Sequence, residues 1–251
     1  MFTRLLVALD GSPQADEAFE QAVWLGKRFG ATIVVAHVRE GRPSDADSSG
    51  LLERAAERVL AAALKCDIEQ RQGDPGLLLA ELARGSDAAL VGRRGRASSG
   101  AGAGTLGATV TTLLKMAERP VIVCGGYPSP MRTCALAFDG GDTSRRALEL
   151  AARYAAITDS TVHLIHASAD RTAGLGIVGA AEATLSLQGV GFVTHIEPGT
   201  PGAAVAAVVK RTGCDALFAG AHVTRGRGSA VTVSHAEEIL RHTDIPVVIQ
   251  P

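Results

Sequence analysis

Residues 5–38 read LLVALDGSPQADEAFEQAVWLGKRFGATIVVAHV, and residues 134–167 read CALAFDGGDTSRRALELAARYAAITDSTVHLIHA. Each stretch holds an apolar run that ends in Asp-Gly, then a helical pattern, and then a β-rich run that ends near a histidine. Asp10 of the first stretch corresponds to Asp139 of the second. A match over so many features indicates that one structural unit is written twice in the chain.

The same correspondence extends along the rest of the sequence. The segment GDPGLLLAELARGSDAALVGRRG at 73–95 matches GTPGAAVAAVVKRTGCDALFAGAHV at 199–223, and ERPVIVC at 118–124 matches DIPVVIQ at 244–250. The offset between matched positions stays between 126 and 129 residues throughout. Because chance similarity would not keep this register, we predict two copies of one domain.

The two predicted domains cover residues 1–126 and 131–251, and GGYPSPM at 125–131 has the Gly and Pro content of a linker. A chain of 251 residues is long enough for two domains, each with its own hydrophobic core. Apolar residues make up 46 % of the chain and charged residues 20 %, which is typical of a globular protein and not of a disordered one.

Each copy alternates strand patterns with helix patterns. In the first copy, strands are expected near 4–9, 31–38, 66–71, 87–92 and 120–124, and helices near 13–29, 51–65, 75–84 and 108–118. Such alternation implies right-handed crossovers and a parallel sheet with helices on both faces. The predicted fold class is therefore α/β, built as two tandem, five-stranded, doubly wound, Rossmann-like domains.

Helix starts and helix faces support this assignment. Apolar residues of the first helix recur at helical spacing and share one face: Ala15, Ala18, Phe19, Ala22 and Val23. An N-cap residue stands before a proline at the first helical position in three places: Ser12-Pro13, Asp74-Pro75 and Thr200-Pro201. We expect each of these pairs to begin a helix.

Charge and hydropathy exclude several classes of function. The formal net charge is −1, so no basic excess points to nucleic acid or to an anionic membrane as a partner. No apolar run approaches the roughly 20 residues that span a bilayer, and no signal-peptide pattern precedes LLVALD, so we expect a cytoplasmic protein. The four cysteines lack CxxC spacing, so we expect small buried hydrophobic residues and no metal site: Cys66, Cys124, Cys134 and Cys214.

The glycine-rich stretch VGRRGRASSGAGAG at 91–104 follows the fourth predicted strand and precedes a helix. Loops after the first and fourth strands of such a sheet meet at the switch point, where ligands bind. Glycines there let backbone N–H groups approach an anion, and arginines add positive charge. The alternatives are a flexible loop with solvated arginines, or a dinucleotide site, which would need GxGxxG after the first strand in place of DGS.

These motifs resemble the universal stress protein family in its tandem, two-copy form. The resemblance covers almost the whole chain and rests on VALDGS, on HV at the end of the second strand, on GDP before the third helix, on VGRRG and on RPVIV. It implies five-stranded domains of order 3-2-1-4-5. Many members bind ATP, with Mg²⁺, through Gly-x2-Gly-x9-Gly-[Ser/Thr], whereas others bind no nucleotide.

Carried over position by position, the resemblance implies a nucleotide site in the first copy, made by Ala8, Asp10, Val38, Gly92, Arg94, Gly95, Gly107, Ala108 and Thr109. The chain departs from the motif at two points. Ala108 stands where the phosphate-binding hydroxyl belongs, and eleven residues, in place of nine, separate Gly95 from Gly107. Taking Gly104 as the last glycine leaves eight, so neither alignment fits fully. We expect weaker ATP binding than in members with the full motif.

The second copy keeps Gly220 but has Val223 and Val233 at the other two glycine positions, followed by Ser234. A β-branched side chain blocks the close approach that a glycine allows. We therefore expect this site to be closed or vestigial. On this view Gly92→Val would abolish binding by filling the cradle, while Gly220→Val would leave binding unchanged.

An enzymatic function has weaker support. DGGDTS at 139–144 partly echoes the SGGxDS loop of ATP pyrophosphatases, but Asp139 replaces its first serine. No Ser-His-Asp order or metal-ligand spacing stands out, and His37, His163 and His166 are expected to be structural. Two classes remain: a nucleotide-binding regulatory module with at most slow ATP hydrolysis and an unidentified protein partner, or an interaction module that binds no nucleotide.

The last strand of each copy, PVIVC in the first and PVVIQ in the second, is apolar. An exposed apolar edge strand is a pairing hazard unless something covers it. We therefore predict that the two copies pair through these strands within one chain, as a homodimer would, and further association of whole chains is compatible with this arrangement.

Overall fold

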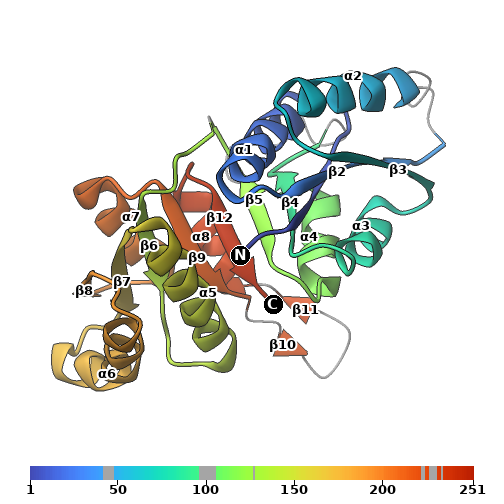
Figure 1. Cartoon of the computed structure of the whole chain (residues 1–251). Helices are drawn as coiled ribbons and strands as arrows, with labels where there is room; N and C mark the ends of the chain where they lie inside the picture. The colour runs from blue at the N-terminus through green and yellow to red at the C-terminus, as the bar shows by residue number, and fades with distance from the viewer. Residues whose placement is uncertain (42–47, 96–105, 127, 222–223, 226–230, 233) are drawn as a thin grey trace. The chain divides into compact units, whose positions relative to one another are not determined.

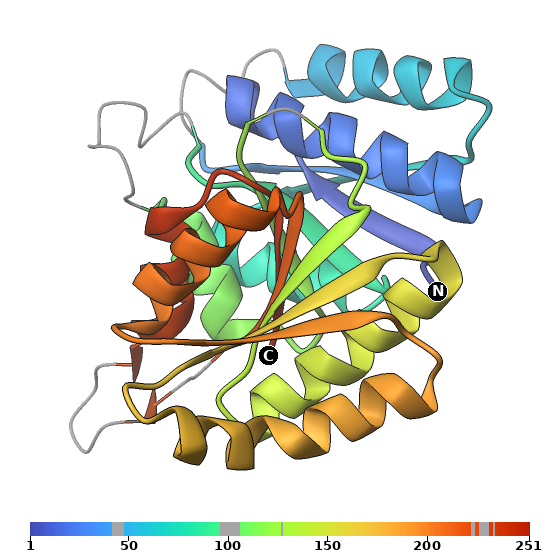
Figure 2. The ribbon, with the colours of Figure 1, turned by 90° about the vertical axis from the view of Figure 1, so that its left-hand side faces the viewer.

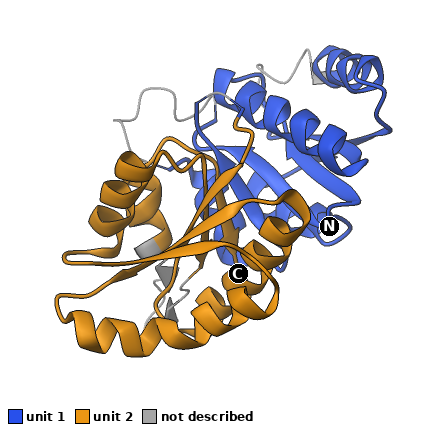
Figure 3. Cartoon of the chain, turned by 60° about the vertical axis from the view of Figure 1, so that its left-hand side comes forward, with its two compact units in different colours: residues 1–128 blue, residues 129–251 orange. Residues whose placement is uncertain are grey.

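The computed structural model describes residues 1–41, 48–95, 106–126, 128–221, 224–225, 231–232 and 234–251. The chain divides into two compact units, Met1–Pro128 and Ser129–Pro251 (Figure 3). The division lies within the stretch 125–131 that was expected to link the two copies. Each unit is an α/β domain with a parallel sheet.

The described part of unit 1 contains five parallel strands and four helices. The strands are β1 (Arg4–Ala8), β2 (Thr32–Arg39), β3 (Cys66–Gln72), β4 (Ala88–Gly92) and β5 (Val121–Cys124), in the sheet order β3-β2-β1-β4-β5. The helices are α1 (Pro13–Phe29), α2 (Ser48–Ala61), α3 (Pro75–Ala83) and α4 (Ala108–Met116). Helices α1 and α2 cover one face of the sheet and α3 and α4 the other (Figure 1).

Unit 2 repeats this architecture. Its sheet order is β12-β9-β6-β7-β8, built from β6 (Thr133–Ala137), β7 (Thr161–Ala167), β8 (Phe192–Glu197), β9 (Ala216–Gly220) and β12 (Val247–Gln250). The helices α5 (Asp142–Thr158) and α6 (Arg171–Leu187) lie on one side, and α7 (Pro201–Thr212) and α8 (Ser234–His242) on the other (Figure 2). Two short strands, β10 (Thr224–Arg225) and β11 (Val231–Thr232), form an antiparallel pair.

The duplication extends to individual hydrogen bonds. Asp87 accepts bonds from the backbone N–H groups of Thr3 and Arg4, and Asp215 accepts equivalent bonds at the start of β6. His37 and His166 are both 7 % exposed. The Nδ1 atom of each contacts the carbonyl oxygen of the residue after its unit's first strand, at 2.6 Å and 2.8 Å. Both histidines thus tie the first two strands of their unit together.

The three expected N-caps are confirmed. The side chains of Ser12, Asp74 and Thr200 each accept a hydrogen bond from the backbone N–H three residues later, at 3.2, 2.9 and 3.4 Å. Each cap is in an extended conformation and is followed by proline, so both sequence signals act at the same turn.

Helix α2, expected near 51–65, differs from the expectation at both ends and begins at Ser48. Helix α2 ends at Ala61, not near residue 65, because the chain tightens through Ala63 N–H to Leu60 O and then turns. Ala63 itself adopts a left-handed conformation, with φ of 59°. The turn reverses the chain so that β3 can begin at Cys66.

Among the described residues, no helix is both long and apolar enough to cross a membrane. The four cysteines are free; Cys124, Cys134 and Cys214 are buried and Cys66 is half-buried. Burial raises the pKa of all four thiols, which keeps them protonated. Cys124, Cys134 and Cys214 are thus the small core residues that the sequence predicts, whereas Cys66 lies outside the core.

Candidate functional site

A cavity of about 190 Å³ opens in unit 1 at the carboxyl ends of β1, β2 and β4. It lies at the switch point of the sheet, where the loops after β1 and β4 diverge. All nine residues expected at a nucleotide site line it: Ala8, Asp10, Val38, Gly92, Arg94, Gly95, Gly107, Ala108 and Thr109. The structure therefore brings together residues that are separated by up to a hundred positions in the sequence.

One wall of the cavity is apolar and the other polar. Val38 and Leu79 are buried and form part of the apolar wall. Asp10 stands at the end of β1, where its Oδ1 atom accepts a hydrogen bond from the N–H of Ser12 at 2.9 Å. This bond holds the turn between β1 and α1 and fixes the carboxylate beside the cavity.

Packing requires a glycine at position 92, the last residue of β4. A Cβ on Gly92 would lie 2.5 Å from the backbone oxygen of Gln14, so β4 passes too close to α1 for any side chain. A Cβ on Gly95 would meet Oδ2 of Asp10, a side-chain atom that can move aside. Gly92 and Gly95 therefore lie against the first turn of α1 and against Asp10.

Two backbone N–H groups of this loop already have partners. Arg94 N–H donates to Oε1 of Gln14 at 2.7 Å, and Gly107 N–H donates to the carbonyl of Arg93 at 2.9 Å. The expected cradle over Gly92–Gly95 is thus partly occupied by the protein's own hydrogen bonds. These bonds fix the two ends of the loop, whose residues 96–105 lie outside the described part of the chain.

Helix α4 begins at the cavity without a side-chain cap. Gly107 is its N-cap residue and makes no side-chain hydrogen bond, whereas Ser12, Asp74 and Thr200 cap their helices. Ala108, the first helical residue, is exposed and lines the cavity. The first-turn N–H groups and the helix dipole favour an anion at this place.

Two half-buried residues of opposite charge, Arg93 and Glu17, contact the end of unit 1 at Gly125 and Gly126. Arg93 packs so closely on Gly125 that a Cβ there would lie 2.5 Å from its Nε atom. Glu17 accepts a hydrogen bond from Gly126 N–H at 3.0 Å. Partial burial raises the pKa of Glu17, although the Gly126 bond and the charge of Arg93 oppose this shift.

Three features of the site carried no local sequence signal. Gln14 reaches the loop after β4 from the first turn of α1, Glu40 lines the cavity beyond β2, and Gly76 packs on Thr112. Each depends on a contact between residues far apart in the chain, so no motif or periodicity could reveal it.

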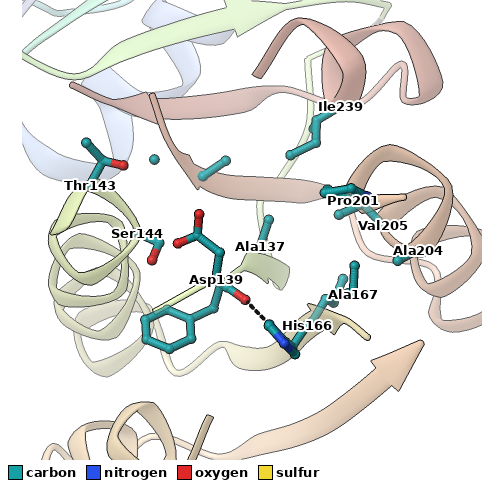
Figure 4. Close-up of a pocket in the computed structure, with 14 residues that line it drawn as sticks. Ala137, Asp139, Thr143, Ser144, His166, Ala167, Pro201, Ala204, Val205 and Ile239 are labelled. Carbon is teal, nitrogen blue, oxygen red and sulfur yellow. Dashed lines mark hydrogen bonds between the residues drawn. The ribbon is translucent and has the colours of Figure 1, made fainter. Parts of the chain in front are cut away.

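Unit 2 has a smaller cavity, of about 80 Å³, at the equivalent place (Figure 4). Thr143 and Ser144 of α5 stand on one side, with the carboxylate of Asp139 beside them, and Pro201, Val205 and Ile239 stand on the other. The site is thus reduced and not absent. Val223 and Val233, which were expected to close it, lie outside the described residues, and Ser234 is described by its backbone alone.

In the described parts of the chain, no group of three or more His, Cys, Asp or Glu side chains could hold a metal ion. His37 lines the cavity of unit 1, but its Nδ1 atom is bound to Leu9 O and its Nε2 atom is buried without a hydrogen-bond partner. His37 is therefore a structural residue in this arrangement, as expected from the sequence.

Comparison with known proteins places the chain in a family. The family model described as "Universal stress protein family" matches residues 1–125 and 175–251. Universal stress protein Slr1230 of Synechocystis sp. is 24 % identical over 282 residues, which cover 97 % of this chain and 98 % of that protein.

Two solved structures show the same fold over the whole chain. A universal stress protein from Archaeoglobus fulgidus has a TM-score of 0.82 at 22 % identity and covers 98 % of this chain and 97 % of its own. The functionally unknown protein PA1789 from Pseudomonas aeruginosa has a TM-score of 0.76 at 16 % identity, covering 99 % of this chain and 92 % of its own. Because the family model matches well over half of its residues, the chain belongs to the universal stress protein family, in a form with two copies of the domain.

Proposed function

We propose that this protein is an adenine-nucleotide-binding regulatory module, with its nucleotide site in unit 1. The observation that carries the proposal is the convergence of the nine expected residues on one cavity of about 190 Å³. Its apolar wall suits a base, its carboxylate suits ribose hydroxyls, and its uncapped helix start suits phosphates. ATP bound against the loop after β4 would couple nucleotide binding to the binding of a protein partner.

The position of each part of the nucleotide follows from the chemistry of the walls. The adenosine would lie near Asp10 and Val38, and the phosphates near the first turn of α4 and the arginine of the loop, Arg94. Mg²⁺ would enter with the phosphates of ATP. The hydrogen bonds that occupy Arg94 N–H and Gly107 N–H leave the phosphates to the N–H groups that follow Gly107.

Ala108 makes the site weak and provides its sharpest test. A hydroxyl at this position would add one charge-assisted hydrogen bond to a phosphate, worth about 1–2 kcal/mol, or roughly five- to thirty-fold in affinity. Ala108 is exposed at the first position of α4, where serine costs the fold little. We expect Ala108→Ser to bind ATP more tightly than the wild type, and Ala108→Glu to lose binding by charge repulsion.

Isothermal titration calorimetry with Mg-ATP measures both effects. The matched control is Ala203→Ser, which places a hydroxyl in the first turn of α7, a helix already capped by Thr200. The control should bind ATP as the wild type does. If neither the wild type nor Ala108→Ser gives heat at millimolar ATP, the chain is the alternative kind of protein, an interaction module that binds no nucleotide.

A further inference from the structure

Two histidines of unit 2 contact each other beside the end of α7. His163 lies on β7 and His195 on β8, and the Nδ1 atom of His163 is 2.9 Å from the Nε2 atom of His195. Their rings are stacked, with centroids 5.2 Å apart and planes inclined by 23°. Both side chains are half-buried. The distance is that of a hydrogen bond, so one ring nitrogen must donate and the other accept.

A third residue favours one direction of this bond. The Nη2 atom of Arg211, on α7, is 3.4 Å from Nδ1 of His195. A guanidinium group can only donate, so this contact favours the tautomer of His195 in which Nδ1 accepts and Nε2 carries the proton. In that tautomer the bonds run from Arg211 to His195 and from His195 to His163, and both imidazoles are neutral.

The surroundings of the pair favour the neutral rings. Arg211 contacts His195 and forms an ion pair with Glu197, while Ala135 of β6 and Val193 of β8 are the register neighbours of His163. Partial burial lowers the pKa of both histidines. The neighbouring His163 and Arg211 lower the pKa of His195 further, and Glu197 opposes them. Glu182 of α6 is engaged with Thr194, on the opposite face of β8.

We propose that His163 and His195 form an acid-sensitive link that holds β8 to β7 and α7. A second proton on His163 Nδ1 would place an N–H against the N–H of His195, and a second proton on His195 Nδ1 would face the N–H groups of Arg211. The first event replaces a hydrogen bond by two opposed N–H donors, and the second replaces one by repulsion between a cationic imidazole and the Arg211 guanidinium. Because β8 is the last strand in the order of unit 2 and pairs with β7, it is the strand that the broken link would loosen.

The same contacts oppose a metal at this pair. A metal ion would need lone pairs on both facing nitrogens at once, which moves the proton of His195 to Nδ1. Arg211 already donates to that atom. The histidine pair is therefore suited to respond to protonation and not to bind a metal ion.

The pH window follows from the direction of the shifts. The ordinary pKa of histidine is 6.5, and both folded-state values are lower, so the unfolded or loosened state binds protons more readily. The link is at full strength above pH 6.5. It weakens as the pH falls below that value and is lost once the pH passes the lowered pKa values.

Unit 1 supplies a matched variant. When the two units are aligned on the matched histidines His37 and His166, Val34 corresponds to His163. The strand registers then match Glu69 with His195. Glu69 pairs with Arg71 at 2.7 Å. A strand of this fold thus accepts valine at the position of His163, and His163→Val removes the link with a residue that the fold already uses.

Hydrogen exchange of the full chain tests the proposal. Exchange rates are first corrected for the intrinsic effect of pH. When the pH is lowered from about 7.5 to about 5, the protection of β8 amides relative to β6 amides should fall by about tenfold in the wild type. It should fall by clearly less in His163→Val, which lacks the bond between His163 and His195 at both pH values and keeps only the contact between Arg211 and His195. His242→Asn, a change at an exposed histidine of α8, should behave as the wild type. The proposal would be overturned if the relative protection of β8 fell equally in the wild type and in His163→Val, or fell in neither.

Imidazole nitrogen NMR on the wild type provides a second readout that needs no variant. We expect the His195 ring to carry its proton on Nε2 near neutral pH and to titrate below 6.5. A proton on Nδ1, or a midpoint at or above 6.5, would contradict the link.

Discussion

Gly92 has a different role from the one its motif suggests. A Cβ at this position would point at the backbone of Gln14, not into the cavity, and a Cβ on Gly220 would meet Thr143 and Ser144 in the same way, at 2.5 Å. The expectation that a valine at 92 fills the phosphate cradle is therefore wrong in its mechanism. The glycine is there because β4 and α1, or β9 and α5, pack backbone to backbone.

We accordingly expect Gly92→Val and Gly220→Val to destabilise their units alike, by about 1–3 kcal/mol, as overpacked sites do. Gly179→Val is the control, because a Cβ at Gly179 of α6 meets nothing within 4 Å. Chemical denaturation monitored by circular dichroism measures all three. If Gly92→Val kept full stability and lost only ATP binding, the valine would be filling the phosphate cradle, as the motif suggests.

The burial of Phe19 in the core of unit 1 can be tested by substitution. Phe19 is 1 % exposed, and the guanidinium carbon of Arg58 lies 4.4 Å from its ring centroid. Phe19→Ala should lower the free energy of unfolding by about 3–5 kcal/mol, since it leaves a cavity in the core. Leu60→Ala, at a side chain that is 61 % exposed, should cost far less. Similar urea midpoints for the two variants would show that the core is misassigned.

At the scale of elements, helices with strong local signals were predictable and long-range contacts were not. A side chain that can cap a helix, followed by proline, predicts a helix start at Ser12, Asp74 and Thr200. The early end of α2 at Ala61 depends on a turn that no residue in 62–65 signals by type. The role of Gln14 could not be predicted for a different reason, because its bond to Arg94 spans eighty positions.

The caps themselves differ in geometry and should differ in strength. Asp74 accepts from Leu77 N–H at 2.9 Å, and Thr200 accepts from Ala203 N–H at 3.4 Å. We expect Asp74→Ala to lower the free energy of unfolding by about 1 kcal/mol and Thr200→Ala by less, because the longer bond is weaker. Thermal unfolding of the two variants measures the difference. A larger loss for Thr200→Ala would contradict this ranking.

For the whole molecule, duplication was the strongest sequence signal. The matched aspartates and histidines of the two copies occupy matched places in two units of the same strand order. The candidate site was harder to predict in detail. Its residues could be named from the motif, but not which of their N–H groups the protein itself occupies.

Pairing of the two copies through their final strands stays a prediction. The apolar sequences VIVC of β5 and VVIQ of β12 motivate it. Interstrand NOEs between backbone protons of β5 and β12 would establish it. Unprotected outer amides on both strands, exchanging at the rates of a free sheet edge, would rule it out.

We propose that unit 1 of this universal stress protein binds adenine nucleotide at the cavity between Asp10 and the start of α4. Calorimetric titration of Mg-ATP into the wild type and into Ala108→Ser tests it most directly. We expect weak binding by the wild type, about five- to thirty-fold tighter binding by Ala108→Ser, and no change in Ala203→Ser. Equal affinities for the wild type and Ala108→Ser would contradict the placement of the phosphates at α4, and no heat from either would contradict nucleotide binding itself.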